Sequence, residues 1–213
     1  MVSCSSCGSE VSTGADYCPR CGTRVHTVSP NTSILGATVP VEVSLGSRMV
    51  RAIKADAQLY EEVEHDPKAT QQVFLVIGIV AAAGAIGIAL RSLILAQPLS
   101  GILLESGVGF VVTVVGIALW SYLLYFIGTR LFKGKATPQE VWRAAGFARS
   151  PGVFYIIPFV GTLANLWMIY TNIIAARQAL DVSTGKAVLV SIVSVIPYLI
   201  LISIVELLIS PLL

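Results

Sequence analysis

The stretch VFLVIGIVAAAGAIGIAL, residues 73–90, decides the fold of this chain. Eighteen consecutive residues without a charge are long enough to cross a bilayer as one helix. The central glycines and alanines favour close approach of neighbouring helices, since burial drives no association between apolar helices in lipid. The composition agrees, with 12% charged residues against about 25% in soluble domains. The sequence therefore predicts an integral membrane protein.

Further apolar segments follow this stretch and predict an all-α bundle of four to five transmembrane helices, one of them short. Residues 93–104 are apolar but contain Pro98, so we expect a short interfacial segment there. Residues 151–179 are too long for one span and too short for two, and Pro158 and Gly161 interrupt them, so the sequence allows one crossing or two. The predicted spans, within a membrane domain of residues 70–213, are 72–91, 107–128, 151–158 (short), 162–179 and 187–210.

The loop between the second and third predicted spans, residues 129–150, carries five basic residues against one acid, Glu140. Excess Lys and Arg in short loops marks the cytoplasmic side, which places this loop and the N-terminus in the cytoplasm. Thr137 and Glu140 form a capping box around Pro138, which predicts a helix within the loop. If residues 151–179 form a hairpin, the C-terminus lies outside. The basic residues of the loop are Arg130, Lys133, Lys135, Arg143 and Arg149.

All four cysteines lie within the first 21 residues, as two Cys-x-x-Cys pairs that are each followed by glycine. Four thiolates form the tetrahedral set that a structural zinc ion prefers, and they leave no open position for catalysis. A segment this short buries no core, so the metal supplies its folding energy. Two disulfides or a redox-active dithiol are the alternatives. The predicted ligands of this zinc ribbon, residues 1–25, are Cys4, Cys7, Cys18 and Cys21.

Two segments connect the ribbon to the first span. Residues 26–46 are rich in Thr, Ser, Val, Pro and Gly, a composition that predicts a flexible linker. In residues 47–66 apolar side chains recur at helical spacing, which predicts one amphipathic surface helix ended by Pro67. This helix either lies on the inner leaflet, with its basic first half toward anionic lipid, or packs on its own membrane domain or on a second copy.

Polar residues inside spans are functional candidates by default. Glu206 is the only acid in a predicted span, although it lies close enough to the C-terminus to reach the far interface as an anchor. Asn165 and Asn172 are seven residues apart on one helix face, where hydrogen bonds between helices are the simplest role. Trp120 lies toward the end of its span, where we expect an interfacial aromatic belt. The sequence has no catalytic constellation, so we expect no enzyme, no catalytic residue and no cofactor except zinc.

Short motifs built from Gly, Pro, aromatic and basic residues punctuate the apolar background. They are Asp66-Pro67, Gly128–Phe132, Gly146–Pro151, Trp167, Ala175–Arg177 and Lys186-Ala187. Together they resemble the Yip family of small membrane proteins, named after the eukaryotic Ypt/Rab-interacting proteins. The resemblance covers about residues 47–210 and is most similar to the prokaryotic branch, which often carries an N-terminal zinc ribbon. It implies about five spans in the plasma (inner) membrane of a prokaryote.

Two hypotheses of function follow. In the first, the protein is a membrane adaptor or scaffold whose zinc ribbon binds a cytosolic partner or a second copy. In the second, it is a small oligomeric transporter or channel that uses Glu206 and the Asn165/Asn172 face. Eukaryotic members of the resembling family act in vesicle traffic and bind prenylated small GTPases, a role that fold alone does not transfer. We expect contact with the lipid bilayer, no nucleic acid and no known small-molecule substrate.

Overall fold

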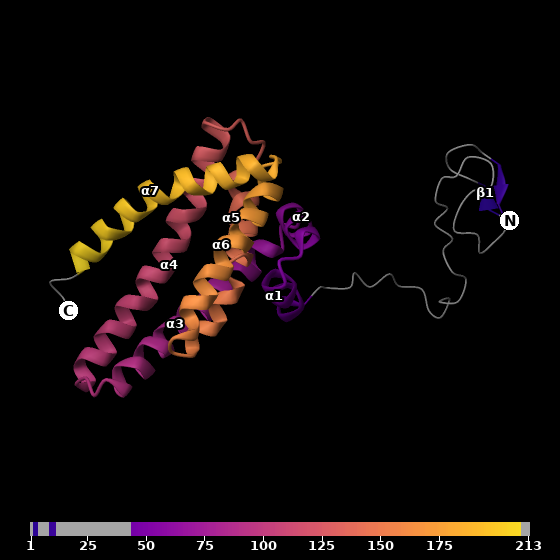
Figure 1. Cartoon of the computed structure of the whole chain (residues 1–213). Coiled ribbons are helices and arrows are strands. Elements are labelled where there is room, and N and C mark those ends of the chain that lie inside the picture. Colours follow the sequence, from indigo (N-terminus) through magenta and orange to yellow (C-terminus); the bar gives the residue numbers. More distant parts are fainter. Residues whose placement is uncertain (1, 4–8, 12–43, 210–213) are drawn as a thin grey trace. The chain divides into compact units, whose positions relative to one another are not determined.

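The computed structural model describes residues 2–3, 9–11 and 44–209, in two compact units, Met1–Glu42 and Val43–Leu213 (Figure 1). In the first unit, strand β1 (Val2–Ser3) pairs antiparallel with β2 (Glu10–Val11). The register joins Val2 to Val11 and Ser3 to Glu10, so the two strands flank the first Cys-x-x-Cys pair in the sequence. The four cysteines themselves lie outside the described residues.

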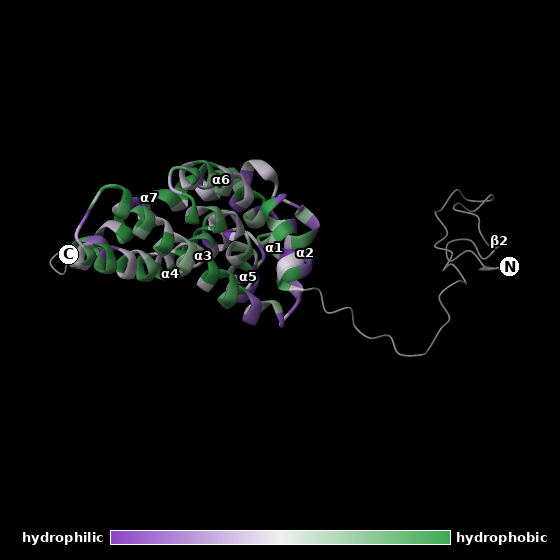
Figure 2. Ribbon diagram, turned by 90° about the horizontal axis from the view of Figure 1, so that it is seen from below, coloured by the Kyte–Doolittle hydropathy of each residue, from purple (hydrophilic) through white to green (hydrophobic). Residues whose placement is uncertain are grey.

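The second unit is helical, and three of its helices, α3, α4 and α7, are long and apolar enough to cross a membrane. The predicted class, an all-α membrane protein, is confirmed. Figure 2 shows hydrophobic residues over these helices and hydrophilic ones concentrated on α1 and α2. The helices are α1 (Leu45–Ile53), α2 (Ala57–His65), α3 (Ala69–Ile94), α4 (Leu99–Arg130), α5 (Pro138–Phe147), the 3-10 helix η1 (Ser150–Ile156), α6 (Val160–Ala179) and α7 (Thr184–Ile209).

The prediction of a separate interfacial segment at residues 93–104 is wrong. Pro98 precedes the first residue of α4, where its missing N–H and fixed φ are tolerated, and the helix then runs unbroken for 32 residues. Ser92, near the end of α3, donates a 3.0 Å hydrogen bond to Glu105 on α4. Glu206 is therefore not the only acid in an apolar helix, because α4 also contains Glu105.

Residues 151–179 fold as a hairpin rather than as one kinked span. After α5 and η1 the chain turns at Phe159, whose φ is 71°, and α6 then returns to the end of the unit where α4 finishes. The Lys135 N–H donates a 2.9 Å hydrogen bond to the Leu180 carbonyl, which joins the α4–α5 loop to the end of α6. The predicted capping box at Thr137 and Glu140 is confirmed and starts α5.

The single amphipathic helix predicted over residues 47–66 is instead two helices, α1 and α2. Ala55 takes a left-handed conformation with φ 58°, which ends the first helix. Asp56 then caps the second, since its side chain accepts a hydrogen bond from the Gln58 N–H. The helical spacing of the apolar residues survives this break, and so the sequence pattern concealed it.

These two helices, residues 45–65, form a cap that packs on its own membrane unit. Arg48 is buried, and its guanidinium lies 2.6 Å from the Asp66 carboxylate and 2.7 Å from the Gln72 amide oxygen. The Trp167 indole N–H of α6 donates a 2.7 Å hydrogen bond to the Ile53 carbonyl. Of the two alternatives for the amphipathic segment, the structure shows packing on the protein's own helices. The fully buried apolar residues of α2 are Leu59, Tyr60 and Val63.

Glu64 is a carboxyl group of the cap that folding removes from water. It is 5% exposed, and its Oε2 has no hydrogen-bond partner among the described residues. Burial, followed by the nearby negative charge of Glu61, raises the pKa of Glu64 to about 7. Arg143 of α5 donates to the backbone carbonyl of Glu64 and leaves the carboxyl group without a guanidinium partner. The cap therefore docks with a carboxyl group that takes up a proton more readily than an ordinary Glu.

We predict that Glu64→Gln raises the melting temperature in detergent at about pH 8. Because the folded pKa of Glu64 lies above its ordinary value, folding binds a proton between these values, and stability falls as pH rises through about 7. The gain should shrink toward about pH 5, where wild-type Glu64 is protonated in the folded protein. Glu62→Gln is the control, since Arg51 holds the pKa of Glu62 below its usual range. A gain that does not change with pH would contradict the prediction.

Gly87 and Gly78 of α3 provide a test of how the hairpin packs. A Cβ at Gly87 would overlap the Tyr155 carbonyl oxygen of η1, whereas a Cβ at Gly78 meets nothing within 4 Å. We expect Gly87→Ala to lower stability by about 1–3 kcal/mol, because the backbone of η1 has to move. Gly78→Ala should be neutral or slightly stabilising, since Ala favours helix. Thermal unfolding of the two purified variants measures this, and equal melting temperatures would contradict the close approach.

Candidate functional site

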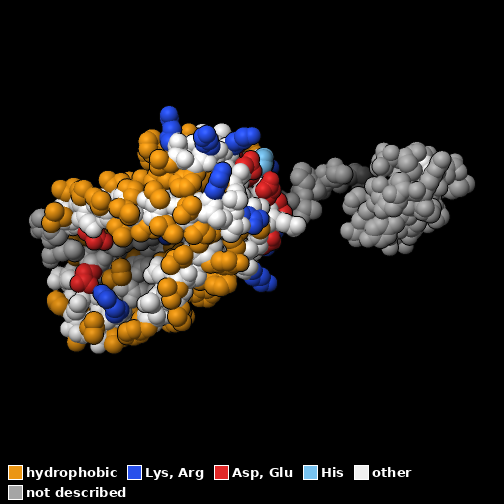
Figure 3. All heavy atoms as spheres, turned by 45° about the horizontal axis from the view of Figure 1, so that its top comes forward, with side chains coloured by type: hydrophobic (Ala, Val, Ile, Leu, Met, Phe, Trp, Pro, Cys, Tyr) orange, Lys and Arg blue, Asp and Glu red, His pale blue; other side chains and the backbone are white. Residues whose placement is uncertain are grey.

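A cavity of about 370 Å³ lies between α4, α6 and α7. Its walls are mainly apolar, and Arg149 contributes the only charge among the lining residues. A second cavity of about 250 Å³ also contains Arg149 and is more polar, with Thr113, Tyr155 and Glu206 in its wall. Figure 3 shows a hollow in this face of the unit between ridges of hydrophobic side chains. The residues that line both cavities are Arg149, Asn165, Met168 and Tyr198.

Arg149 is positioned by the short helix α5, which ends at Phe147 and delivers the chain into the bundle. The guanidinium carbon lies 5.7 Å from the centroid of the Trp120 ring. Its buried Nε has no hydrogen-bond partner, and no carboxylate of the described residues lies within 4.0 Å as an ion pair. Arg149 is therefore a cation that the bundle contacts through an aromatic face and through no counter-charge.

The depth of this cation follows from its neighbour on α4. Trp120 lies ten residues before Arg130, the last residue of α4, or about 15 Å along the helix axis. That is about half of a hydrocarbon core of about 30 Å. An Arg at such a depth costs about 2.5–3.5 kcal/mol on insertion scales, and a desolvated cation–π contact offsets about 2 kcal/mol. The aromatic contact alone therefore does not fully offset the free-energy cost of placing the Arg149 charge at this depth.

Hydrogen bonds between elements fix the polar residues around the guanidinium. The Trp120 indole N–H donates a 2.8 Å hydrogen bond to the Asn172 amide oxygen, and Trp120 packs edge-on against Tyr198 at 5.4 Å. The Tyr155 hydroxyl of η1 donates to the Asn165 amide oxygen. Asn165 and Asn172 thus lie on one face of α6, as predicted, and both take part in hydrogen bonds with other elements while lining the first cavity.

Glu206 lies near the end of α7 with an exposed side chain. The structure places it in the wall of the second cavity together with Arg149 and Asn165, and not in the wall of the first. Glu206 and the Asn165/Asn172 face, the two polar features predicted inside the membrane, therefore both share a cavity wall with Arg149. Glu206 forms no ion pair within the described residues.

The predictions for Arg149 and Trp120 are wrong. Arg149 was expected in the cytoplasmic loop and Trp120 in an aromatic belt, but both side chains lie inside the bundle. Residues 144–160 contain Arg149 as their single charge, and such isolation in an apolar run was a signal for burial. Gly146 and Gly152 allow this burial, since a Cβ at either position would press on Val73 or Val80 of α3.

The donor set of the ribbon fits zinc, because four thiols in two Cys-x-x-Cys pairs match the ligands of a closed tetrahedral site. The predicted ligands Cys4, Cys7, Cys18 and Cys21 lie outside the described residues.

Comparison with known proteins supplies the family. The model of the Yip1 domain matches residues 53–205, and the model of a zinc-ribbon domain matches residues 3–25, a range that contains all four cysteines. No curated protein and no solved structure matches the chain. The family model covers well over half of the chain, so the resemblance predicted from the sequence is confirmed. This chain belongs to the Yip1 domain family of membrane proteins and carries an N-terminal zinc-ribbon domain.

Proposed function

We propose that this protein is a membrane adaptor whose helical unit presents the zinc ribbon to a cytosolic partner or to a second copy. The observation that carries the proposal is the fixed cap. Arg48 and Asp66 lie 2.6 Å apart, and Trp167 bonds to the Ile53 carbonyl, so the segment that follows the ribbon is held on the membrane unit. The predicted linker, residues 26–46, reaches about 25 Å from this support.

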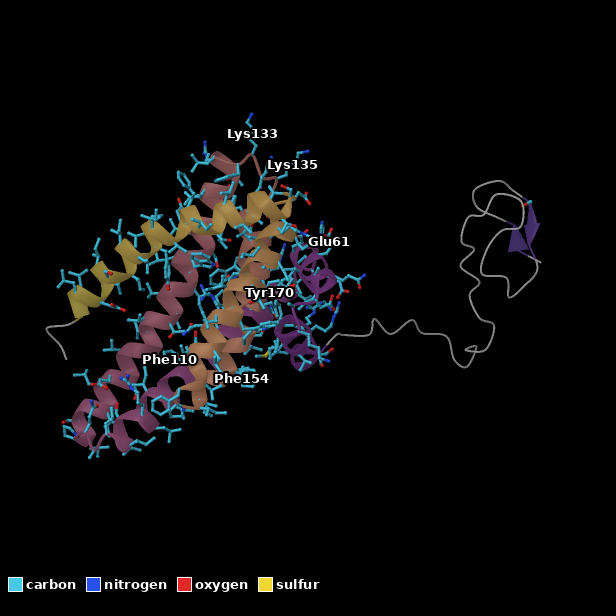
Figure 4. All side chains as sticks on the ribbon, viewed as in Figure 1. Glu61, Phe110, Lys133, Lys135, Phe154 and Tyr170 are labelled. Carbon is cyan, nitrogen blue, oxygen red and sulfur yellow. The ribbon has the colours of Figure 1, made fainter. Side chains whose placement is uncertain are left out.

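An orientation with the ribbon in the cytoplasm supports an adaptor role. Lys133, Lys135 and Glu61 lie toward the same end of the unit, and Phe110 lies away from it (Figure 4). Arg177 near the end of α6 and Lys186 near the start of α7 flank a turn that is hydrogen-bonded to the α4–α5 loop through Leu180. Clustering of basic residues at one end favours the cytoplasm there. With α5–η1 and α6 counted as two passes, five passes put the C-terminus outside.

A topology measurement tests this orientation. We expect a reporter fused after Leu213 to be active outside and a reporter inserted between Lys133 and Lys135 to be active inside. The zinc ribbon should report from the same side as the insertion. If both reporters are active on the cytoplasmic side, the α5–η1–α6 hairpin does not count as two passes and the five-pass arrangement is wrong.

We infer that the ribbon holds one structural zinc ion through Cys4, Cys7, Cys18 and Cys21. When bound, zinc supplies folding energy and no catalysis, because the four thiolates fill its coordination sphere. A folded ribbon offers a partner a defined surface, which a chain of 25 residues without metal does not. Thiolate ligands also agree with a reducing, cytoplasmic location.

Site-specific photocrosslinking in the native host tests the adaptor role. A photoreactive residue at Tyr17 should crosslink to a cytosolic protein or to a second copy. The double variant Cys18→Ser and Cys21→Ser should lose this product and the bound zinc while the melting temperature of the helical unit stays unchanged. The matched control places the photoreactive residue at Leu95, an exposed residue of the α3–α4 turn at the opposite end. Equal products with and without the ribbon cysteines would contradict the proposal.

A transporter or channel is the second candidate, favoured by the position of Arg149 near the middle of the predicted membrane region. It uses the same cavities, with Glu206 and the Asn165/Asn172 face. Under this alternative Glu206→Gln or Asn172→Ala abolishes flux, and deletion of residues 1–22 is tolerated. Under the adaptor role, a complementation experiment should show that deletion of residues 1–22 abolishes function, whereas Glu206→Gln and Asn172→Ala are tolerated.

A further inference from the structure

The apolar cavity between α6 and α7 opens toward the lipid side of the membrane unit. Its wall includes residues that are also exposed on the outer surface of the two helices, and in a membrane protein such apolar surface faces acyl chains. A ligand thus has a lateral route from the bilayer into the cavity. These residues and their exposed fractions are Leu166 (61%), Ile169 (59%), Ile192 (57%) and Leu199 (54%).

At its inner end the cavity presents the unpaired guanidinium of Arg149. The planar fork of an Arg side chain matches carboxylate and phosphate oxygens in two parallel hydrogen bonds. Trp120 covers the face of the guanidinium and leaves its edge for such an acceptor. Asn172 is already occupied, because its oxygen accepts from Trp120 and its nitrogen donates to the Met168 carbonyl. The charge of Arg149 is therefore the feature of this wall that a ligand has to complement.

We propose that the cavity binds an anionic amphiphile from the bilayer, with its carboxylate or phosphate head on Arg149 and an acyl chain along the α6–α7 wall. Its volume of about 370 Å³ falls in the range of about 300–1,000 Å³ found for small-molecule sites. The apolar wall favours an acyl chain, and the charge of Arg149 favours a negative head group. Glu206 lines the second cavity and not this wall, and it forms no ion pair with Arg149 within the described residues, so it leaves the guanidinium without a counter-charge. The site does not depend on the adaptor role of the ribbon.

Native mass spectrometry of the full chain, released from a neutral maltoside detergent, measures the binding. The probes are dodecyl phosphate, oleate and inorganic phosphate. We expect wild type to bind dodecyl phosphate and oleate, and Arg149→Gln to weaken both by about tenfold or more, since hydrogen bonds to a charged group are lost. Arg91→Gln is the matched control, because Arg91 lies at the exposed end of α3 and lines neither cavity.

A second pair of variants tests the chain-binding wall. Val195→Trp fills the cavity from α7 and should abolish binding of dodecyl phosphate. Val193→Trp changes a similarly exposed residue of the same helix outside both cavities and should bind as wild type does. If Arg149→Gln fails to fold, Arg149→Lys replaces it, and weaker binding by a folded Lys variant supports the two-bond contact.

Three results would overturn the proposal. Unchanged affinity in Arg149→Gln would show that the head group does not bind Arg149, and unchanged affinity in a folded Arg149→Lys would show that the two parallel hydrogen bonds do not form. Equal binding of dodecyl phosphate by Val195→Trp and Val193→Trp would show that the acyl chain does not occupy the α6–α7 wall. Displacement of dodecyl phosphate by an equal concentration of inorganic phosphate identifies a site for a small anion rather than for a lipid.

Discussion

The close approach of η1 to α3 is the constraint on which the rest of the membrane unit depends. Backbone at membrane depth has to bury its N–H and C=O groups within protein, because lipid offers no hydrogen bonds. A 3-10 helix of seven residues followed by a turn meets this condition only against other helices. Gly87 provides the contact, since its missing side chain leaves room for the Tyr155 carbonyl. The start of α6, the place of Arg149 and the support for α1 all follow from this one contact.

Burial of Arg149 is the consequence of that packing with the strongest bearing on function. The chain reaches it through α5, whose small residues Ala144, Ala145 and Gly146 let the helix lie deep against α3 and α4. The guanidinium then packs against the Trp120 ring, and no carboxylate of the described residues pairs with it. Replacing such a cation by an apolar residue of similar size avoids its desolvation and is often neutral or stabilising. The proposed head-group site would give the charge of Arg149 a role that packing does not.

Hydropathy alone predicted α3, α7 and the second part of α4, because apolar runs of this length are typical of transmembrane helices. It missed the first turns of α4, which we expected to be a separate interfacial segment. Local hydrogen bonding predicted the start of α5, since Thr137 and Glu140 act within one turn. What escaped prediction depends on contacts between distant residues. Arg149 follows a segment rich in basic residues, which the sequence places in a loop, and only its partner 29 residues earlier, Trp120, shows that it lies inside the bundle. The break at Ala55 escaped for another reason, since a left-handed alanine leaves no mark in the pattern of apolar residues.

The cap and the cavity are attached to opposite sides of the same hairpin. On one side, α1 contacts η1, and Trp167 of α6 bonds to the Ile53 carbonyl. On the other, Asn165 and Asn172 of α6 face the cavity. Any change that displaces the hairpin backbone therefore alters the docking of the cap and the site at Arg149 together. Only side-chain changes that leave α6 in place separate the two, which is why substitutions at Arg149 and on α7 are informative, whereas a deletion within residues 150–179 is not.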